Sequence, residues 1–372
     1  MKTTRRLLLI ICLISFTGIS YSQPEYEFKI FQFPADRIPR IDGNPDDWDI
    51  VPDSYSIGSD QLKDDEKKHE RNDPDNLDVR VKVGWVNGMN KLYFLYEAYD
   101  DYWDFSRTDL HHDIFEVVVD GDQSGGPLIE QFHPNPDLNN SWDAYFNYHG
   151  VHAQNYHIFT PAENQDWCLA WGSQPWIKEL PWSNAAYSYD FRPGESGKLV
   201  LEFWITPFDY AGREGPVRAV ESVLKEGKKI GLCWAIIDFD DVNAKGNNGF
   251  WNLSDKHTMY GNASQLRTFI LMPPEPEFIK KIDAKWSFKV VDMNRRLVAF
   301  QDESAGRITS WKWDFGDGTT SPEQHPVHAY NKAGRYIVTL YIEGPDGKSH
   351  RAKVWDVAVR SETLDYGVKS NE

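Results

Sequence analysis

Cysteine is scarce in this chain of 372 residues, where only Cys12, Cys168 and Cys233 occur. The sequence has neither a Cys-x-x-Cys pair nor a His-Glu-x-x-His motif, so it lacks the ligand spacings of common zinc sites. It also lacks a Gly-x-Ser-x-Gly motif, which leaves serine-hydrolase chemistry poorly supported. After residue 22 no run reaches the ~18 apolar residues of a membrane-spanning helix, so no membrane span is predicted.

Positive charge is also in short supply, because 40 lysines and arginines stand against 57 aspartates and glutamates, giving a net charge of -17. A nucleic-acid-binding protein needs clustered lysine and arginine for its phosphate contacts, so that function class is excluded. The hydrophobic fraction of 40% is enough for a folded core and excludes a disordered chain. Aromatic residues make up 14% of the chain, and both a core and a sugar-binding surface use such residues.

Residues 1–22 have the composition of a secretory signal peptide. A basic start with Lys2, Arg5 and Arg6 precedes an apolar stretch over residues 7–16, and small residues lead up to Gln23. The sequence therefore predicts cleavage between Ser22 and Gln23 and a periplasmic or secreted protein. Such a compartment permits a disulfide between Cys168 and Cys233, but two buried thiols fit the sequence equally well.

Many short strands are predicted, with little helix between them. Residues 79–86 and 91–100 alternate between polar and apolar and flank a turn at residues 87–90, which is typical of a hairpin. A helix is expected only at residues 217–228. This pattern predicts an all-β chain whose main domain is a β-sandwich. The further strands are expected at residues 113–119, 144–149, 151–159, 198–206, 230–238 and 266–271.

Two domains are expected after the signal peptide: a large sandwich over residues 23–275 and a smaller β unit over residues 284–362. A Pro-Pro-Glu-Pro segment at residues 273–276 separates them. The smaller unit contains Trp313-Asp314-Phe315-Gly316-Asp317-Gly318, followed by His328-Ala329-Tyr330 and Gly334-Arg335-Tyr336. These motifs resemble those of PKD domains, which are immunoglobulin-like sandwiches. The resemblance implies a spacer or adhesion role for this unit.

The large domain carries a second set of motifs, spread over residues 38–272. They are Ile41-Asp42-Gly43, Asp46-Asp47-Trp48, Leu92-Tyr93-Phe94, Asp100-Asp101, residues 113–117 and Asp120-Gly121-Asp122. Together they resemble the family 9 carbohydrate-binding-module-like (DOMON-like) sandwiches. That sandwich hosts sugar binders, haem binders and catalytic relatives, so the resemblance implies a fold more strongly than a function.

The two domains together resemble secreted proteins of algal polysaccharide-utilisation systems, among them PKD-containing dehydratases that act on uronate-ended ulvan oligosaccharides. This resemblance implies an acidic oligosaccharide as the partner and a hydro-lyase reaction. The product would be a 4,5-unsaturated uronate formed by loss of water from the non-reducing end. The rival hypothesis is a non-catalytic protein that captures glycans. Haem or electron-transfer binding is a third alternative, and it predicts a Soret band.

The expected hairpin of residues 144–149 and 151–159 suggests where chemistry is located. If the chain turns at His149-Gly150, one face carries Tyr145, Asn147, His152, Gln154 and Tyr156. The opposite face is apolar and is expected to be core, with Asn155 and His157 on that side. Six of the eleven histidines lie between residues 111 and 157. Imidazoles suit proton transfer or metal binding, which a sugar-stacking surface does not require.

These faces lead to a set of site residues. The base and acid are expected among His112, His152 and Tyr156, and the uronate carboxylate is expected to bind Arg80, Lys82 or Arg107. Further substrate contacts are expected from Tyr145, Asn147, Gln154 and Trp204. Composition leaves a glycosidase that uses two carboxylates open, but Glu116 and Glu202 are too ordinary to carry that assignment.

Four further segments carry an interpretation, and two of them have two alternatives. The oxygen-rich segment at residues 120–126 suits a structural calcium ion near Asp120 and Asp122 or an Asp-rich turn, and no other cofactor is expected. Trp167, Trp171, Trp176 and Trp182 suit sugar stacking or a loop packed by its own indoles. Residues 251–257 are expected to border a binding site, whereas the acidic run at residues 60–75 is expected to be a solvated loop.

Overall fold

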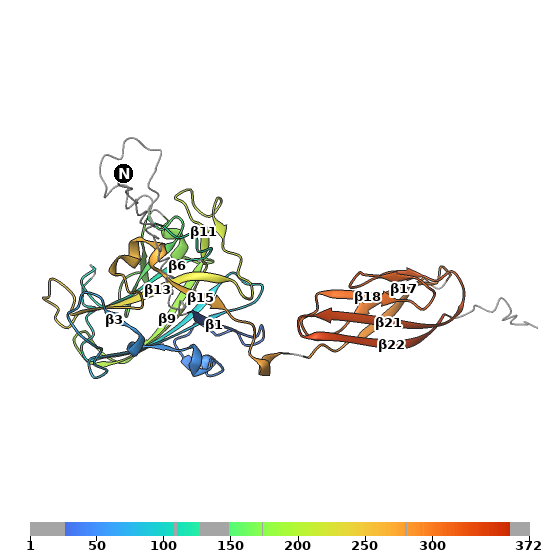
Figure 1. Ribbon diagram of the computed structural model, residues 1–372, viewed down its shortest axis with the longest axis horizontal. Helices are drawn as coiled ribbons and strands as arrows, with labels where there is room; N and C mark the ends of the chain where they lie inside the picture. The colour runs from blue at the N-terminus through green and yellow to red at the C-terminus, as the bar shows by residue number, and fades with distance from the viewer. Residues whose placement is uncertain are drawn as a thin grey trace, which may run out of the picture. The chain divides into compact units, whose positions relative to one another are not determined.

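The computed structural model shows a chain made of strands and short 3-10 helices. It describes residues 27–107, 110–126, 149–172, 174–279, 281–292 and 294–357. Within these ranges there is no α-helix, and no helix is long and apolar enough to cross a membrane. The chain divides into two compact units, residues 1–273 and residues 274–372 (Figure 1). The expected all-β fold class is confirmed. The signal-peptide prediction lies outside the described residues.

The first unit is a β-sandwich. Its strands are β1 (Phe28–Gln32), β2 (Ile57–Gly58), β3 (Lys63–Asp64), β4 (Leu77–Trp85), β5 (Leu92–Asp100), β6 (Ile114–Asp120), β7 (Gln154–Phe159), β8 (Cys168–Ala170), β9 (Ser183–Tyr189), β10 (Gly197–Ile205), β11 (Phe208–Tyr210), β12 (Val220–Glu221), β13 (Lys229–Asp238), β14 (Gly249–Asn252) and β15 (Arg267–Leu271). Its 3-10 helices are η1 (Pro45–Trp48), η2 (Asp53–Tyr55), η3 (Ser59–Gln61), η4 (Pro175–Lys178), η5 (His257–Gly261) and η6 (Ala263–Gln265).

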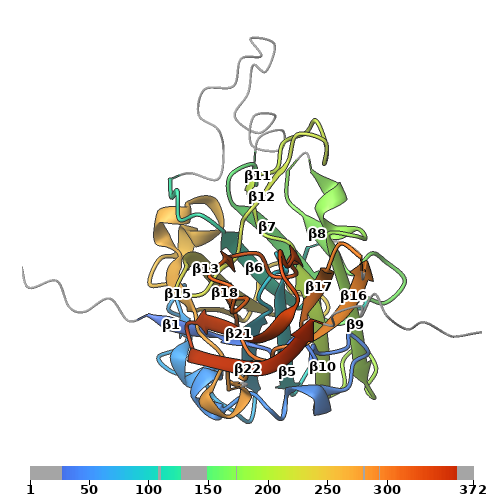
Figure 2. The same cartoon turned by 90° about the vertical axis from the view of Figure 1, so that its right-hand side faces the viewer.

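The sandwich has two layers that β1 joins. One layer has the order β8-β7-β6-β13-β15, and the other has the order β4-β5-β10-β9. Figure 2 shows β5, β10 and β9 side by side. The first residues of β1 pair in parallel with β15, and Phe31 and Gln32 pair in parallel with β4. The second half of β13 pairs with β14, which in turn pairs with β3. The loops around β3 and β14 therefore lie beside β13.

Most strands form where the alternation predicts them. β4 and β5 pair from Leu77↔Asp100 to Trp85↔Leu92, and Gly88 in the turn has a φ of 84° that glycine adopts without strain. The helix expected at residues 217–228 is wrong. That segment holds β12 and turns, and its valines Val217 and Val223 are exposed. Val217, Val220 and Val223 are spaced by three residues, which is typical of one face of a helix. All three are exposed in the structure, so no apolar surface stabilises a helix here.

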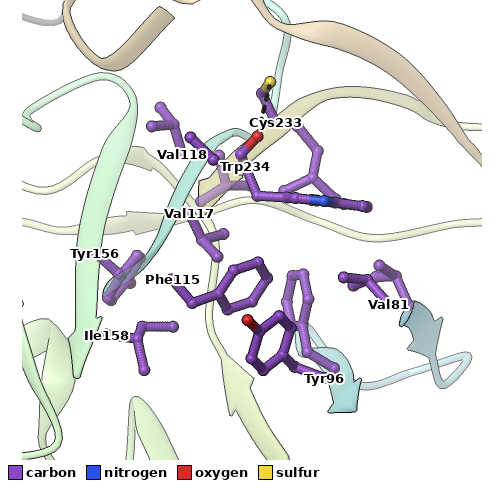
Figure 3. Packing of buried hydrophobic residues seen from close by; sticks show 14 of the residues in the cluster. Val81, Tyr96, Phe115, Val117, Val118, Tyr156, Ile158, Cys233 and Trp234 are labelled. Carbon is purple, nitrogen blue, oxygen red and sulfur yellow. Dashed lines mark hydrogen bonds between the residues drawn. The ribbon is translucent and has the colours of Figure 1, made fainter. Parts of the chain in front are cut away.

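The core lies between the two layers. Because side chains alternate along a strand, the residues that enter the core determine which of their neighbours point outward. Phe115 and Val117 on β6 point inward, where Phe115 stacks on Tyr96 with ring centroids 4.4 Å apart. Tyr156 stands opposite Val117 on β7 and belongs to the same packed group (Figure 3). Glu116, one residue along β6, therefore points to the outer side of this layer.

The outer side of the other layer is covered by the chain between β1 and β2. Phe33 passes so close to Gly84 on β4 that a Cβ there would lie 2.1 Å from its ring. Glu202 on β10 accepts hydrogen bonds from the Trp48 indole at 2.9 Å and from the Gly43 amide at 2.8 Å. The motif at residues 41–48 thus has a structural role: it packs over the outer side of this layer and is held there by the buried Glu202 carboxylate.

The second unit is a smaller sandwich of two sheets. Its elements are η7 (Pro276–Phe278), β16 (Trp286–Asp292), β17 (Leu297–Asp302), β18 (Ser310–Asp314), β19 (Thr320–Ser321), β20 (Val327–Ala329), β21 (Gly334–Gly344) and β22 (Gly347–Val357). One sheet has the order β16-β17-β20 and the other β19-β18-β21-β22. Trp286, Phe300 and Trp313 pack in its core.

Both cysteines of the described chain are free thiols. Cys168 lies on β8 and Cys233 on β13, and both are buried. The two strands are separated in their layer by β7 and β6. Of the two alternatives left by the sequence, the structure contains the buried thiols and not the disulfide.

Candidate functional site

A cavity of about 720 Å³ lies on the outer side of the β6–β7–β13 layer. Its floor comes from these strands through Glu116, Asn155, His157 and Ile237. Its walls come from the segment after β3, the segment ahead of β6, Trp171 after β8, the segment between β13 and β14, and η5. All lining residues belong to the first unit.

Glu116 is the buried carboxylate at the floor of the cavity. It stands directly opposite His157 on β7, and His157 Nε2 lies 2.8 Å from its Oε1. The Asn155 amide donates to the same oxygen at 2.9 Å. Burial alone would raise the pKa of Glu116, but the charge and hydrogen bond of His157 and the bond from Asn155 outweigh burial, so the pKa is lowered. The carboxylate is therefore ionised at neutral pH.

Two further rings enclose this carboxylate. The Trp171 ring lies edge-on to His157, with centroids 5.2 Å apart, and also contacts His149 at 6.3 Å. His149 is fully buried. Burial lowers the pKa of His149 to about 4, even though the charge of Glu116 acts in the opposite direction. His149 is therefore neutral at pH 7, and it contributes a ring rather than a charge.

A second carboxylate–histidine pair supports one wall, which His257 lines. Asp65 follows β3, and its Oδ1 lies 2.7 Å from His257 Nδ1 in η5. The Asn252 amide, at the end of β14, donates to the other Asp65 oxygen at 2.6 Å. Asn252 is itself fixed, because its Oδ1 accepts the Ser254 amide at 2.8 Å. The pair is thus held from behind by a buried side chain.

Aromatic rings connect the two pairs. The Phe250 ring lies 4.8 Å from His257, and the Tyr260 ring lies 5.7 Å from it at 89°. The Tyr260 carbonyl accepts a hydrogen bond of 3.3 Å from Asn155, which also binds Glu116. Burial, followed by the charges of Glu116 and Asp65, raises the pKa of Tyr260. Its phenol is therefore neutral at physiological pH.

The rim carries charge of both signs. Lys245 is the only lysine or arginine among the described residues that line the cavity, and Glu66 lies on the same rim. The loop after β3 is ordered by the Asp64 carboxylate, which accepts backbone amides from Glu66, Lys68 and His69. Lys68 Nζ then binds the carbonyl of Asn247 at 2.7 Å. The part of the acidic run that follows β3 is thus an ordered wall of the cavity. The prediction that residues 60–75 form a solvated loop is wrong for Asp65.

The three expected catalytic residues do not line the cavity. Tyr156 is buried in the core, where burial and then the thiol of Cys168 raise the pKa of its phenol well above 10. The prediction that Tyr156 shares an outer face with His152 is wrong. Because β7 pairs with β6 so that Val117 faces Tyr156, the outward residues are Asn155 and His157, which were expected on the core side.

His112 and His152 lie elsewhere. His112 is buried ahead of β6, where its Nδ1 lies 3.1 Å from the Asp113 carbonyl and its ring packs on Phe159. The His152 ring contacts Tyr210 at 5.7 Å, at the β11–β12 hairpin. Gln154, expected to bind substrate, is buried and bonds the backbone of Phe208 through both ends of its amide.

The expected cationic residues are dispersed. Arg80 and Lys82 lie on β4 in the other layer, where Lys82 Nζ approaches the Val51 carbonyl at 3.5 Å. Trp204 is also in that layer, beneath Lys91 Nζ at 3.3 Å from the ring centroid. Arg107 pairs with Asp104 at 2.8 Å and donates to the Ala244 carbonyl at 3.2 Å. None of these residues lines the cavity, so their predicted roles in binding a substrate there are wrong, although Arg107 supports the loop that carries Lys245.

Tyr145 and Asn147, with the strand expected at residues 144–149, lie outside the described residues, so their predicted roles stay predictions. At residues 120–126 the carboxylates close a turn: Asp120 accepts the Gly125 amide at 2.8 Å, and Asp122 accepts the Ser124 amide at 3.0 Å. A structural calcium ion there also stays a prediction.

The tryptophan-rich segment is mostly packed on itself. Trp176 and Trp182 lie 5.7 Å apart and both contact Phe208. Trp167 stacks on the core residue Tyr156. Only Trp171 of this group faces the cavity in the described structure. Of the two interpretations, the packed loop holds for three indoles, and a ligand-facing ring remains available in the fourth.

Comparison with known proteins identifies the second unit. Residues 291–359 match the family model described as PKD domain. Collagenase ColQ1 of Bacillus cereus strain Q1 is 39% identical over 66 residues, which make up 18% of this chain and 7% of that protein. The PKD1 domain of the Vibrio cholerae metalloprotease PrtV is 32% identical at a TM-score of 0.20 and covers 22% of this chain and 100% of that chain. The PKD expectation is confirmed by the family model.

For the first unit, a family 9 carbohydrate-binding module from Caldicellulosiruptor kristjanssonii, solved with cellotriose, is similar. It is 12% identical at a TM-score of 0.42 and covers 69% of this chain and 99% of that chain. The chain spans only 7% of the length of the curated collagenase and PrtV relatives, through the PKD segment. None of these likenesses assigns a role to the cavity.

Proposed function

We propose that the cavity of the first unit binds the end of an acidic oligosaccharide and that the protein captures such glycans. The observation that carries this proposal is the combination of aromatic walls and a polar floor in one cavity. Its volume of about 720 Å³ falls within the usual range for small-ligand sites. Trp171, Phe250 and Tyr260 offer apolar faces for a sugar ring, and Asn155 with Glu116 offers hydrogen-bonding groups.

The acidic part of the proposal rests on Lys245. This exposed ammonium group lies on the rim, while the buried Glu116 occupies the floor. A carboxylate or sulfate on the bound sugar is favoured at the rim and disfavoured at the floor. A location outside the cytoplasm, as residues 1–22 predict, would expose the cavity to polysaccharide fragments.

Calorimetric titration tests this proposal. Oligosaccharides made from ulvan by mild acid hydrolysis are expected to bind, and neutral cellotriose is expected to bind more weakly. Trp171→Ala should weaken binding of both by about tenfold, which corresponds to about 1.4 kcal/mol. Lys245→Gln should weaken only the acidic ligand. Equal binding of both ligands by the wild type and by Lys245→Gln contradicts the acidic preference.

A second candidate function is the dehydratase reaction on a terminal uronate. The observation that favours it is that two carboxylate–histidine pairs meet at one cavity: Glu116 and His157 line its floor, and His257, paired with Asp65, lines its wall. Binding alone does not require such pairs, whereas proton transfer near neutral pH does. Incubation with the same ulvan oligosaccharides followed by mass spectrometry tests it. A product lighter by one water supports the enzyme, and an unchanged mass with intact binding supports the capture protein.

A further inference from the structure

We propose that His257 is the proton-transfer group of this cavity and that Asp65 and Asn252 position it. The inference rests on the second candidate function, and it assigns different roles to the two carboxylate–histidine pairs. Glu116 and His157 form the floor that holds the ligand, and the Asp65–His257 pair performs the chemistry. The two pairs differ in the ring nitrogen that each leaves accessible to a ligand.

His157 cannot present a nitrogen to a ligand in this structure. Its Nε2 is used by Glu116, and its Nδ1 is buried without a hydrogen-bond partner among the described residues. The side chain of His157 is 11% exposed and that of Glu116 is 2% exposed. The Trp171 ring closes the remaining side. A base needs hydrogen-bond reach to the proton that it removes, and His157 lacks it.

His257 has the opposite arrangement. Its Nδ1 faces Asp65, so its Nε2 is the nitrogen left for a ligand, and its side chain is 41% exposed against 8% for Asp65. A carboxylate behind Nδ1 fixes the ring orientation and stabilises the imidazolium that forms when Nε2 takes a proton. His257 thus combines a fixed ring with an accessible nitrogen.

Asp65 acts through His257 and not on the ligand. One of its oxygens binds His257 and the other accepts from Asn252 at 2.6 Å, so both oxygens are engaged. Asn252 belongs to β14 and pairs there with Lys63 of β3, immediately before the Asp64–Asp65 segment. The pair is therefore anchored to the sheet at both ends, which limits its movement during a reaction.

The step balances with groups of this chain alone. His257 Nε2 removes the C5 proton of the terminal uronate, and the C5–H electron pair forms the C4–C5 double bond. The C4–O bond breaks, and the hydroxyl leaves as water with the phenolic proton of Tyr260. His257 then returns its proton to the Tyr260 phenolate. Lys245 balances the uronate carboxylate during the step, when charge builds up beside it.

The test compares His257→Gln and Asp65→Asn with His152→Gln, whose ring contacts Tyr210 and lies outside the cavity lining. Binding of acid-hydrolysed ulvan oligosaccharides is measured by calorimetry, and water loss by mass spectrometry. His257→Gln is expected to bind within about threefold of the wild type and to lose about 100-fold or more in rate. His152→Gln is expected to match the wild type in both measurements.

Asp65→Asn provides a measurement that a purely structural role would not change. Among the described residues, Asp65 and Tyr260 are the titratable groups that contact His257, and Glu66, His111, Glu116, His157 and Lys245 line the same cavity. Removing the Asp65 charge makes the imidazolium that forms during the step less stable. The rate constant kcat for water loss should therefore fall about tenfold or more, while KM and the calorimetric binding of the oligosaccharides stay within about threefold of the wild type.

The outcomes separate the two levels of the proposal. A His257→Gln rate near that of the wild type overturns the assignment of His257. An unchanged kcat in Asp65→Asn, or a loss of binding as large as the loss of rate, overturns the positioning role. Binding by the wild type without water loss at any pH overturns this inference and leaves the capture function standing. Absence of binding by the wild type overturns the proposed function and this inference with it.

Discussion

Glu116 on β6 and His157 on β7 face each other across two neighbouring strands, with Oε1 and Nε2 2.8 Å apart. The hydrogen bond from Asn155 completes the group at 2.9 Å. This group occupies the floor of the cavity and is shielded from water. Because a buried charge is costly unless it is paired, a change to this group is expected to lower the free energy of unfolding of the first unit.

Glu116→Ala is expected to destabilise the first unit by about 3–5 kcal/mol, because the change leaves the buried His157 Nε2 without its partner and removes one of the two acceptors of the Asn155 amide. Glu116→Gln keeps an oxygen acceptor at the same place and should cost about 1–2 kcal/mol. Urea unfolding followed by tryptophan fluorescence measures both. Equal losses for the two variants would mean that the hydrogen bonds do not determine the effect.

The stability of the first unit is expected to fall as the pH rises from 5 to 9. The carboxylates of Asp100, Asp113 and Asp238 are buried within 4.8 Å of one another. Burial, and then the charge of Asp238, raises the pKa of Asp100 to about 9, whereas burial and then the charge of Asp240 raise that of Asp238 to about 7. A carboxyl group whose pKa is higher in the folded state than in the unfolded state stabilises the fold while it is protonated. This stability is fully present below the unfolded-state pKa near ~3.9 and is lost as the pH rises through the folded-state pKa.

Calorimetric melting across this pH range checks the expectation. Asp238→Asn removes one charge from the cluster and should flatten the decline. Asp241→Asn, which changes an exposed carboxylate on the following loop, is the matched control and should leave the decline as it is. A melting temperature that rises from pH 5 to pH 9 contradicts this account.

The fold follows from local patterns, but the site depends on pairing between distant strands. The alternation at residues 79–100 predicts β4 and β5 because each strand has one apolar face, and the structure bears this out. The outward face of β7 is different. A hairpin that turns at His149-Gly150 predicts that Tyr156 points outward. In the structure β7 pairs with β6, and this pairing turns Tyr156 inward. A shift of one residue exchanges the faces of a strand.

The wall of the cavity was harder to predict for a different reason. Asp65 and His257 are 192 positions apart, and only the pairing of β3 with β14 brings them together. An acidic run such as residues 60–75 usually indicates solvent exposure, and no local signal distinguishes Asp65 from its neighbours. The segment at residues 251–257 was expected to border a site, and the cavity includes His257 from it.

Both thiols are expected to be unreactive in the folded protein. Burial raises the pKa of Cys233 to about 12, and burial also raises that of Cys168 well above 9. Since the thiolate is the reactive form, a thiol reagent should label neither residue until the chain unfolds in denaturant. The intact mass should be the same with and without reductant. Rapid labelling of the native protein, or a mass change on reduction, would contradict the free buried thiols.

Trp313→Ala should destabilise the second unit without affecting the cavity. The indole is fully buried and packs 5.5 Å from Trp286 and 5.4 Å from Phe300, so its removal should cost about 3–5 kcal/mol. All residues that line the cavity belong to the first unit, so calorimetric binding of ulvan oligosaccharides should be unchanged. Weaker binding in Trp313→Ala would mean that the PKD unit takes part in recognition.

Tyr156→Phe separates the two interpretations of Tyr156. If this residue were the acid of a dehydratase, loss of its hydroxyl would abolish water loss from the uronate. In the structure the hydroxyl is buried and has no hydrogen-bond partner among the described residues. Its removal therefore relieves an unsatisfied polar group, which typically costs about 1–3 kcal/mol. Tyr156→Phe is expected to melt at a higher temperature, to bind the oligosaccharides like the wild type and to remove water at the wild-type rate. Tyr260→Phe is expected to bind but to be unable to remove water.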